Sequence, residues 1–78
     1  MTAEKAIPAV LAYCKEQIDN FDVRADLALD RMDKERIPLE STDFRLADEV
    51  YDCLDDWCTD HECEWLYDEI TMEDILFY

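Results

Sequence analysis

The sequence predicts a small all-α bundle, in which one long N-terminal helix of about residues 7–35 packs on two or three shorter helices. Apolar residues recur at helical spacing in both halves of the chain, and the expected helix starts carry capping residues. Glycine is absent, which disfavours β-hairpins and phosphate-binding loops. The chain has 78 residues, half of them hydrophobic, so we expect one acidic helical domain over residues 1–78 rather than a disordered tail.

A seam of apolar residues, spaced alternately four and three apart, marks the long helix. Pro8 fits best in a first helical turn, where its missing N–H costs little, so the helix is expected to begin near Ile7, after a turn capped by Thr2. Asn20 and Asp22 are possible interruption signals, but the seam keeps its phase past them and favours one continuous helix. The seam comprises Ile7, Leu11, Cys14, Ile18, Phe21, Ala25, Ala28 and Met32.

The long helix is expected to end near Glu35, because a residue before proline, here Ile37, is pushed out of the α region. A short loop through Leu39 and Glu40 then leads to a second helix of about residues 42–58. Ser41 or Thr42 would cap this helix. Its apolar side is expected to hold Phe44, Ala47, Val50, Tyr51, Leu54, Trp57 and Cys58, and acids occupy the opposite side.

Two further helices are predicted from capping signals. Thr59 and Glu62 match a capping box and predict a helix of about residues 60–70, with Trp65, Leu66 and Ile70 facing inward. Thr71 has an acid three residues later and predicts a last helix of about residues 72–77. The apolar residues 75–78 are expected to close the core or to form a self-association or partner surface.

Charge is distributed unevenly along the chain. Residues 1–45 hold ten acids and all seven Lys and Arg residues, whereas residues 46–78 hold twelve acids and no Lys or Arg, a net charge of −12. Such a field repels nucleic acid and anionic membranes and attracts basic protein surfaces. We therefore expect neither direct nucleic-acid binding nor membrane binding.

The four cysteines do not predict a disulfide framework. No secretory leader is recognisable, since the apolar run at residues 6–14 is short and broken by Pro8, and this favours a reducing cytoplasm. Potential zinc ligands are Cys53, Cys58, His61 and Cys63, but their spacing is poor because the first two lie on different sides of one helix. We assign no metal site and no cofactor, and a zinc-binding module stays the third alternative.

The predicted function is that of a non-enzymatic acidic binder. Successive helical turns place carboxylates at a density that approximates a nucleic-acid backbone, so the acidic face would occupy the basic nucleic-acid site of another protein. A DNA-mimic inhibitor from a phage or mobile element would act in this way. Trp57, Trp65 and Tyr67 are candidate anchors near the edge of this face. The candidate partner-binding residues are Asp48, Glu49, Asp52, Asp55, Asp56 and Asp60, extended by Glu62 and Glu64.

The second alternative is a structural or regulatory adaptor that binds through the apolar residues 75–78, including as a homodimer. No pair of carboxylates stands out for acid–base catalysis, because that chemistry requires two carboxyl groups in different environments within a cleft. Cys58 and His61 lack an oxyanion hole and a third, orienting group. We therefore expect no catalytic residues.

Overall fold

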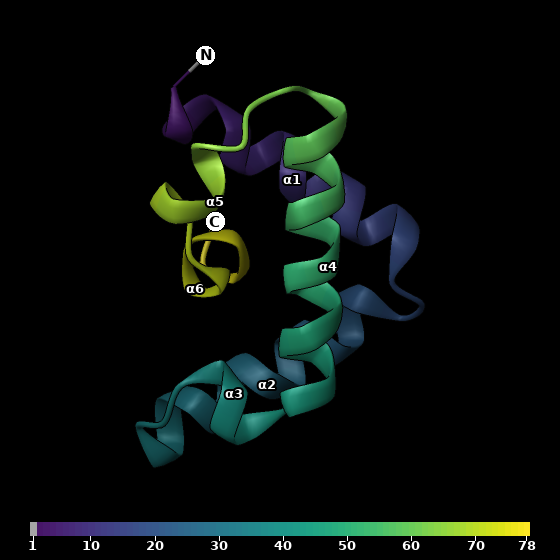
Figure 1. Cartoon of the computed structure of the whole chain (residues 1–78). Helices are drawn as coiled ribbons and strands as arrows, with labels where there is room; N and C mark the ends of the chain where they lie inside the picture. The colour runs from purple at the N-terminus through teal and green to yellow at the C-terminus, as the bar shows by residue number, and fades with distance from the viewer. Residues whose placement is uncertain (1) are drawn as a thin grey trace.

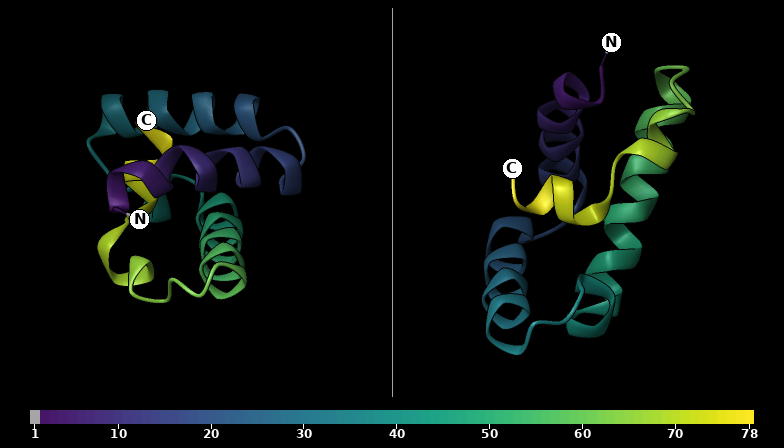
Figure 2. Two further views of the ribbon diagram at one scale, coloured as in Figure 1. Left: turned by 90° about the horizontal axis from the view of Figure 1, so that it is seen from above. Right: turned by 90° about the vertical axis from the view of Figure 1, so that its left-hand side faces the viewer.

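A computed structural model describes residues 2–78 and confirms a small all-α bundle. Six helices follow one another: α1 (Ala3–Gln17), α2 (Phe21–Glu35), α3 (Leu39–Thr42), α4 (Phe44–Asp60), α5 (Leu66–Glu69) and α6 (Met72–Leu76). Helices α1 and α2 diverge in a V from the turn that joins them and form one layer, and α4 crosses in front of them (Figures 1 and 2). Helices α5 and α6 fold back so that α6 packs against both α1 and α4.

The single long helix predicted over residues 7–35 is wrong, because the chain reverses between α1 and α2. Asn20 adopts the left-handed conformation at φ 56°, which an asparagine tolerates better than most residues. The two halves of the seam still face the core, since all members from Cys14 to Met32 are buried. In the first half, Ala6 and Val10 are buried, while Ile7 and Leu11 are only partly covered.

Helix α1 begins earlier than Ile7. The Thr2 hydroxyl accepts a hydrogen bond from the Lys5 amide at 3.4 Å and caps a helix that starts at Ala3. Pro8 therefore lies inside α1 rather than in its first turn. The helix tolerates Pro8 at the cost of one backbone hydrogen bond.

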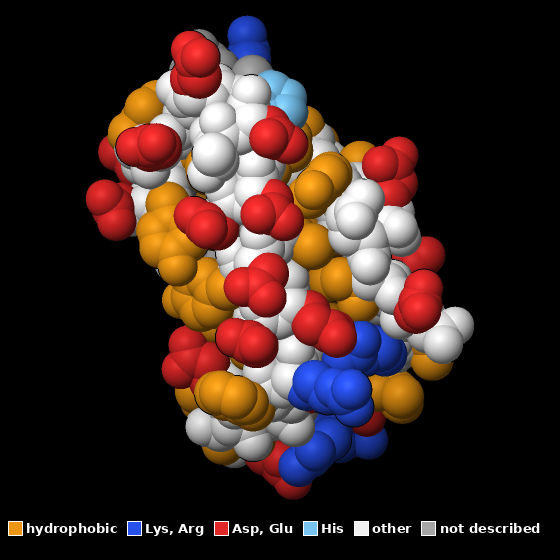
Figure 3. All heavy atoms as spheres, turned by 45° about the vertical axis from the view of Figure 1, so that its right-hand side comes forward, with side chains coloured by type: hydrophobic (Ala, Val, Ile, Leu, Met, Phe, Trp, Pro, Cys, Tyr) orange, Lys and Arg blue, Asp and Glu red, His pale blue; other side chains and the backbone are white. Residues whose placement is uncertain are grey.

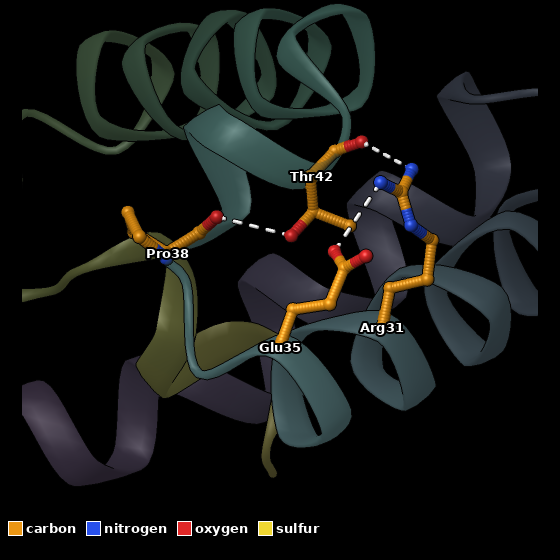
Figure 4. A network of polar contacts seen from close by, with 4 residues as sticks. All are labelled: Arg31, Glu35, Pro38 and Thr42. Carbon is orange, nitrogen blue, oxygen red and sulfur yellow. Dashed lines mark hydrogen bonds and ion pairs between the residues drawn. The ribbon is translucent and has the colours of Figure 1, made fainter.

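The segment predicted as a loop at Leu39 and Glu40 forms the short helix α3, which is fixed to α2 by polar contacts (Figure 4). Arg31 donates to the Thr42 carbonyl oxygen at 3.1 Å and pairs with Glu35 at 3.3 Å. The Thr42 hydroxyl donates to the Pro38 carbonyl oxygen at 3.1 Å, so it does not cap α4. These contacts set the position from which α4 starts.

The core lies between the α1–α2 layer and the inner face of α4, with the C-terminal helices completing it. The largest fully buried side chains include Leu39, Leu46, Leu54, Leu66 and Ile75. The capping box at Thr71 is confirmed, because Thr71 and Asp74 exchange side-chain-to-backbone hydrogen bonds. Within residues 2–78, no helix has both the length and the apolar character needed to cross a membrane.

Candidate functional site

Helix α4 presents the acidic face, and local capping fixes both of its ends. The Asp43 carboxylate, rather than Ser41 or Thr42, accepts a hydrogen bond from the Leu46 amide at 3.1 Å. At the other end, the Cys63 amide donates to the Cys58 carbonyl at 2.9 Å, and the Glu62 amide donates to the Thr59 carbonyl at 3.3 Å. This is a Schellman motif, with Glu62 at φ 54° in the left-handed position that glycine usually occupies.

This motif overturns the predicted capping box at Thr59. Thr59 lies within α4, which continues to Asp60, so it cannot adopt the extended conformation that an N-cap requires. The predicted helix over residues 60–70 is reduced to α5 at Leu66–Glu69. Glu62 and Glu64 are exposed on the bend after α4 and do not continue the regular spacing of its acids.

Four exposed aspartates recur every fourth residue along the outside of α4 in a row that turns about the helix by ~40° per step, and we call this row the aspartate column: Asp48, Asp52, Asp56 and Asp60. They recur every four residues, so neighbours are ~6 Å apart along the helix axis and the column spans ~18 Å. Asp55 is also exposed and lies beside the column. Figure 3 shows this run of carboxylates down the face of the helix.

Glu49, also predicted as a partner-binding residue, is already engaged within the protein. Its carboxylate accepts a hydrogen bond from Arg24 of α2, and both side chains are partly buried. A carboxylate held in this way is less available to a partner, because binding there would have to replace the internal ion pair. Glu49 therefore fits a structural role between α2 and α4 better than a contact role.

The aspartate column has no ion-pair partner among residues 2–78. The ion pairs there join Lys15 to Asp22, Arg24 to Glu49, Arg31 to Glu35 and Lys34 to Asp30. All lie at or before position 49, which matches the absence of Lys and Arg after Arg45. No cationic side chain among these residues therefore offsets the mutual repulsion of the column's members.

Tyrosine rings border the acidic face on both sides. On one side, Tyr51 of α4 contacts Tyr67 of α5, with ring centroids 5.9 Å apart and planes tilted by 37°. On the other side lies Tyr13 of α1, whose pKa is raised by burial and then by the nearby Asp56 and Asp60 carboxylates. Figure 3 shows hydrophobic side chains on either side of the carboxylates. Binding at this face would therefore involve both charge and aromatic surface.

Sequence reasoning missed Tyr13, because its place beside Asp56 and Asp60 depends on how α1 crosses α4. The three aromatic residues predicted as anchors, Trp57, Trp65 and Tyr67, differ in their exposure to solvent. Trp57 is only 5% exposed and stacks on His61 at 4.0 Å between ring centroids, so it belongs to the core. Trp65 is 46% exposed rather than turned inward, and it and Tyr67 remain available to a partner.

Phe44 was also expected to face inward, but it is 74% exposed at the first position of α4. Burial of α4 begins two residues later, at Leu46. Its buried face consists of Leu46, Ala47, Val50, Cys53, Leu54, Trp57 and Cys58.

The potential zinc ligands point in different directions. Cys53 and Cys58 are buried in the core, whereas the Cys63 thiol donates to the His61 carbonyl oxygen at 3.1 Å. The His61 ring lies against the Trp57 carbonyl, with Nδ1 at 2.9 Å from that oxygen. Across residues 2–78, no group of three or more His, Cys, Asp or Glu residues is arranged to hold a metal ion.

A groove of about 700 Å³ lies beside the acidic face, between the α1–α2 turn and the first half of α4. Its walls carry Arg24 and Arg45 as well as Asp19, Glu49 and Asp52, so its charge is mixed. Cys53 also lines it.

Comparison of the chain with protein-family models, with curated proteins and with solved structures found no match.

Proposed function

We propose that this protein is a non-enzymatic cytoplasmic binder whose acidic face occupies the basic, nucleic-acid-binding surface of a partner protein, as a DNA-mimic inhibitor from a phage or mobile element would. The observation that carries this proposal is the aspartate column: four exposed carboxylates spaced four residues apart, without an ion-pair partner within residues 2–78. Like charges at this spacing destabilise a helix. A binding partner that neutralises them accounts for their presence.

The charge spacing supports a nucleic-acid-binding surface as the target. Carboxylates ~6 Å apart over ~18 Å compare with phosphates ~3.4 Å apart along one strand of a duplex. Asp55 adds a further charge beside the column and raises the density. A cationic groove shaped for phosphates would therefore meet a row of anions somewhat more than half as dense as the phosphates of one strand.

The tyrosine borders favour arginine over lysine on the partner. A guanidinium can stack on an aromatic ring while it pairs with a neighbouring carboxylate, whereas a lysine ammonium is more strongly hydrated. Tyr13 lies near Asp56 and Asp60, and Tyr67 stands against Tyr51 on the opposite border. We expect arginine-rich surfaces to bind more tightly than lysine-rich surfaces of equal charge.

A second candidate function is an adaptor or homodimer that uses the C-terminal end. The structure divides residues 75–78 into two parts: Ile75 and Leu76 are buried, while Phe77 and Tyr78 are 63% and 70% exposed. Only these last two residues are free to contact a partner. The exposed pair keeps this alternative open but offers a small apolar area.

The proposal is tested by affinity capture from an extract of the native host, at low and high salt, with three versions of the protein. The column variant changes the four column aspartates to Asn. The control variant removes four exposed acids of the α1–α2 layer instead, by changing Glu4 and Glu16 to Gln and Asp26 and Asp33 to Asn. The two variants have the same net charge, so they separate the position of the charge from its amount.

We expect the wild type and the control variant to capture a nucleic-acid-binding protein that high salt and added duplex DNA release. The column variant should lose this capture. Equal capture by all three versions would refute the proposal. If only a Phe77→Ser, Tyr78→Ser double variant loses the partner, the adaptor alternative is correct.

A further inference from the structure

Helix α2 carries two large apolar side chains on its outer surface, and the core does not use them. Val23 is 60% exposed and Leu27 is 65% exposed. They lie four residues apart, so both project from one face of the helix, a turn from each other. Other residues of α2 form its buried side. Val23 and Leu27 therefore form an exposed apolar ridge, which we call the α2 ridge.

A hollow of about 330 Å³ lies beside the α2 ridge, between α2 and the segment that leads into α4. Leu27 and Ala28 supply apolar surface to it. Arg31 and Thr42, which also line it, link its two sides through the hydrogen bond drawn in Figure 4. Two helices pack by placing the side-chain ridge of one into the groove of the other. The outer surface of α2 offers a ridge and a hollow side by side, as such a contact requires.

The charges around the α2 ridge are balanced within the molecule. Helical spacing places three cations on the same side of α2 as the ridge, and each has a carboxylate partner. These ion pairs are Arg24 with Glu49, Arg31 with Glu35 and Lys34 with Asp30. Figure 3 shows Lys and Arg side chains gathered at the end of the molecule where α2 and the start of α4 lie. An apolar centre inside a rim of paired charges is the usual anatomy of a protein–protein interface.

Charge balance also bears on which partner covers the ridge. A protein of net charge −15 repels its own copies over most of its surface, so a neutral apolar surface is where two copies can meet. A strongly basic or strongly acidic partner, by contrast, gains nothing from charges that are already paired. The α2 ridge therefore suits a second copy of this chain.

The order of residues along α2 supports the same partner. In an antiparallel pair of α2 helices with the two Leu27 side chains at a two-fold axis, residues equally far from Leu27 face each other. Asp30 then lies opposite Arg24 of the other copy, since each is three residues from Leu27. Arg31 lies opposite Val23 of the other copy, and the aliphatic part of an arginine covers apolar surface well. The pairing brings opposite charges together twice and covers both ridges.

We propose that this protein forms a two-fold symmetric dimer through α2, in which the α2 ridge of each copy packs against α2 of the other. A helix of 15 residues is ~22 Å long and ~10–12 Å wide, so the contact covers roughly a few hundred Å² of each copy. A stable dimer usually covers ~800 Å² of each partner. The dimer is therefore a weak one, which forms at a protein concentration on the order of 100 μM rather than at nanomolar concentration.

This inference goes beyond the proposed function and does not rest on it. The aspartate column belongs to α4 and takes no part in the contact, so a dimer carries two columns. A partner with two basic sites can bind both columns at once, which raises its avidity without any new contact. Dimer formation would therefore strengthen binding to a two-fold symmetric partner.

The test is sedimentation velocity of the purified, full-length protein over a range of concentrations, at low and high salt. No partner is needed, so the result is independent of the capture experiment. The ridge variant changes Val23 and Leu27 to Ser. The matched control changes Phe77 and Tyr78 to Ser, because these are exposed apolar residues at the C-terminal end. Both variants keep the net charge, and circular dichroism verifies that each is folded.

A cross-linking measurement locates the contact. Cys63, which is only partly buried, is first replaced by Ser. In this background the Leu27→Cys variant is oxidised at high protein concentration and compared with Ala9→Cys, at an exposed position of α1. Only a two-fold axis near Leu27 brings the two copies of that residue together, so a covalent dimer of the Leu27→Cys variant identifies the symmetric contact.

We expect the wild type and the C-terminal control to change from monomer to dimer as the concentration rises. High salt should strengthen the dimer, because it screens the repulsion between two acidic chains. The ridge variant should stay monomeric. Leu27→Cys should give a covalent dimer, and Ala9→Cys should not.

A wild type that stays monomeric at the highest concentration, or a folded ridge variant that dimerises like the wild type, overturns the proposal. If only the C-terminal control loses the dimer, Phe77 and Tyr78 form the self-association surface and α2 does not. The wild-type and cross-linking results decide the matter even if the ridge variant fails to fold.

Discussion

Neutralising the centre of the aspartate column should stabilise the fold. Each like-charge pair at i,i+4 costs ~0.2–0.5 kcal/mol in a helix. Asp52 and Asp56 together take part in all three such pairs of the column, with Asp48 and Asp60 as the outer members. The double variant Asp52→Asn, Asp56→Asn should therefore gain roughly 0.6–1.5 kcal/mol in free energy of unfolding at low salt.

This gain comes from charge alone, because Asn and Asp have similar helix propensities. For a domain of this size, about 1 kcal/mol raises the melting temperature by roughly 4–8 °C. Urea denaturation gives the free energy, and thermal melting gives the midpoint. Both should be measured at low salt and at ~1 M salt, where screening over ~3 Å removes most of the gain.

The matched control is Glu16→Gln with Asp33→Asn, which removes two charges but no i,i+4 pair of acids. Residues 12 and 20 flank Glu16 at that spacing, and residues 29 and 37 flank Asp33, and none of them is acidic. The control should change stability little. If the Asp52→Asn, Asp56→Asn variant is less stable than the wild type, or if the control gains as much stability, then repulsion within the column does not destabilise the fold.

Three further predictions concern the rest of the fold. Arg36 adopts the left-handed conformation at φ 55° after α2, so Arg36→Gly should stabilise the protein by about 1 kcal/mol relative to Arg36→Ala in urea denaturation; an equal effect would refute strain there. Trp57→Ala removes a buried ring and should cost about 3–5 kcal/mol in free energy of unfolding, and a cost below ~1 kcal/mol would show that the ring does not support the core. Burial, followed by neighbouring carboxylates, raises the pKa of Tyr13 and, mainly through burial, of Tyr51, so the folded protein holds these protons more tightly than the unfolded chain. Stability should therefore be full below the ordinary tyrosine pKa of ~10 and fall as the pH rises above it, and a tyrosine absorbance titration that matches the unfolded chain would contradict this.

The sequence predicted which residues are buried better than where helices end. The seam from Cys14 to Met32 is buried as expected, but its regular spacing concealed the reversal at Asn20. The spacing of apolar residues indicates which face of a helix packs against the core. It does not report whether the chain turns back between two helices that both bury the same side.

Helix ends were hard to predict because glycine is absent from the chain. Left-handed positions that glycine usually fills are taken by Asn20, Arg36 and Glu62. Of these, only Asn20 is recognisable as a turn residue from its type. At Thr59, a matching capping pattern was overruled by the Schellman motif that closes α4 one residue later.

The acidic face followed from α4 alone, since helical spacing places the column on one side. The contacts between helices could not be predicted from the sequence of any one helix. The pairing of Glu49 with Arg24 and the place of Tyr13 beside Asp56 depend on how α1, α2 and α4 cross. No local pattern encodes a crossing angle.

The central claim is that the aspartate column occupies a nucleic-acid-binding surface, and competition with DNA tests it most directly. A captured partner is bound to labelled duplex DNA, and the anisotropy of the label is followed as this protein is added. Wild type and the control variant should displace the DNA. The column variant should need roughly four- to a thousandfold more protein, since four exposed ion pairs contribute ~0.2–1 kcal/mol each. A partner that binds this protein and DNA at the same time would contradict the account.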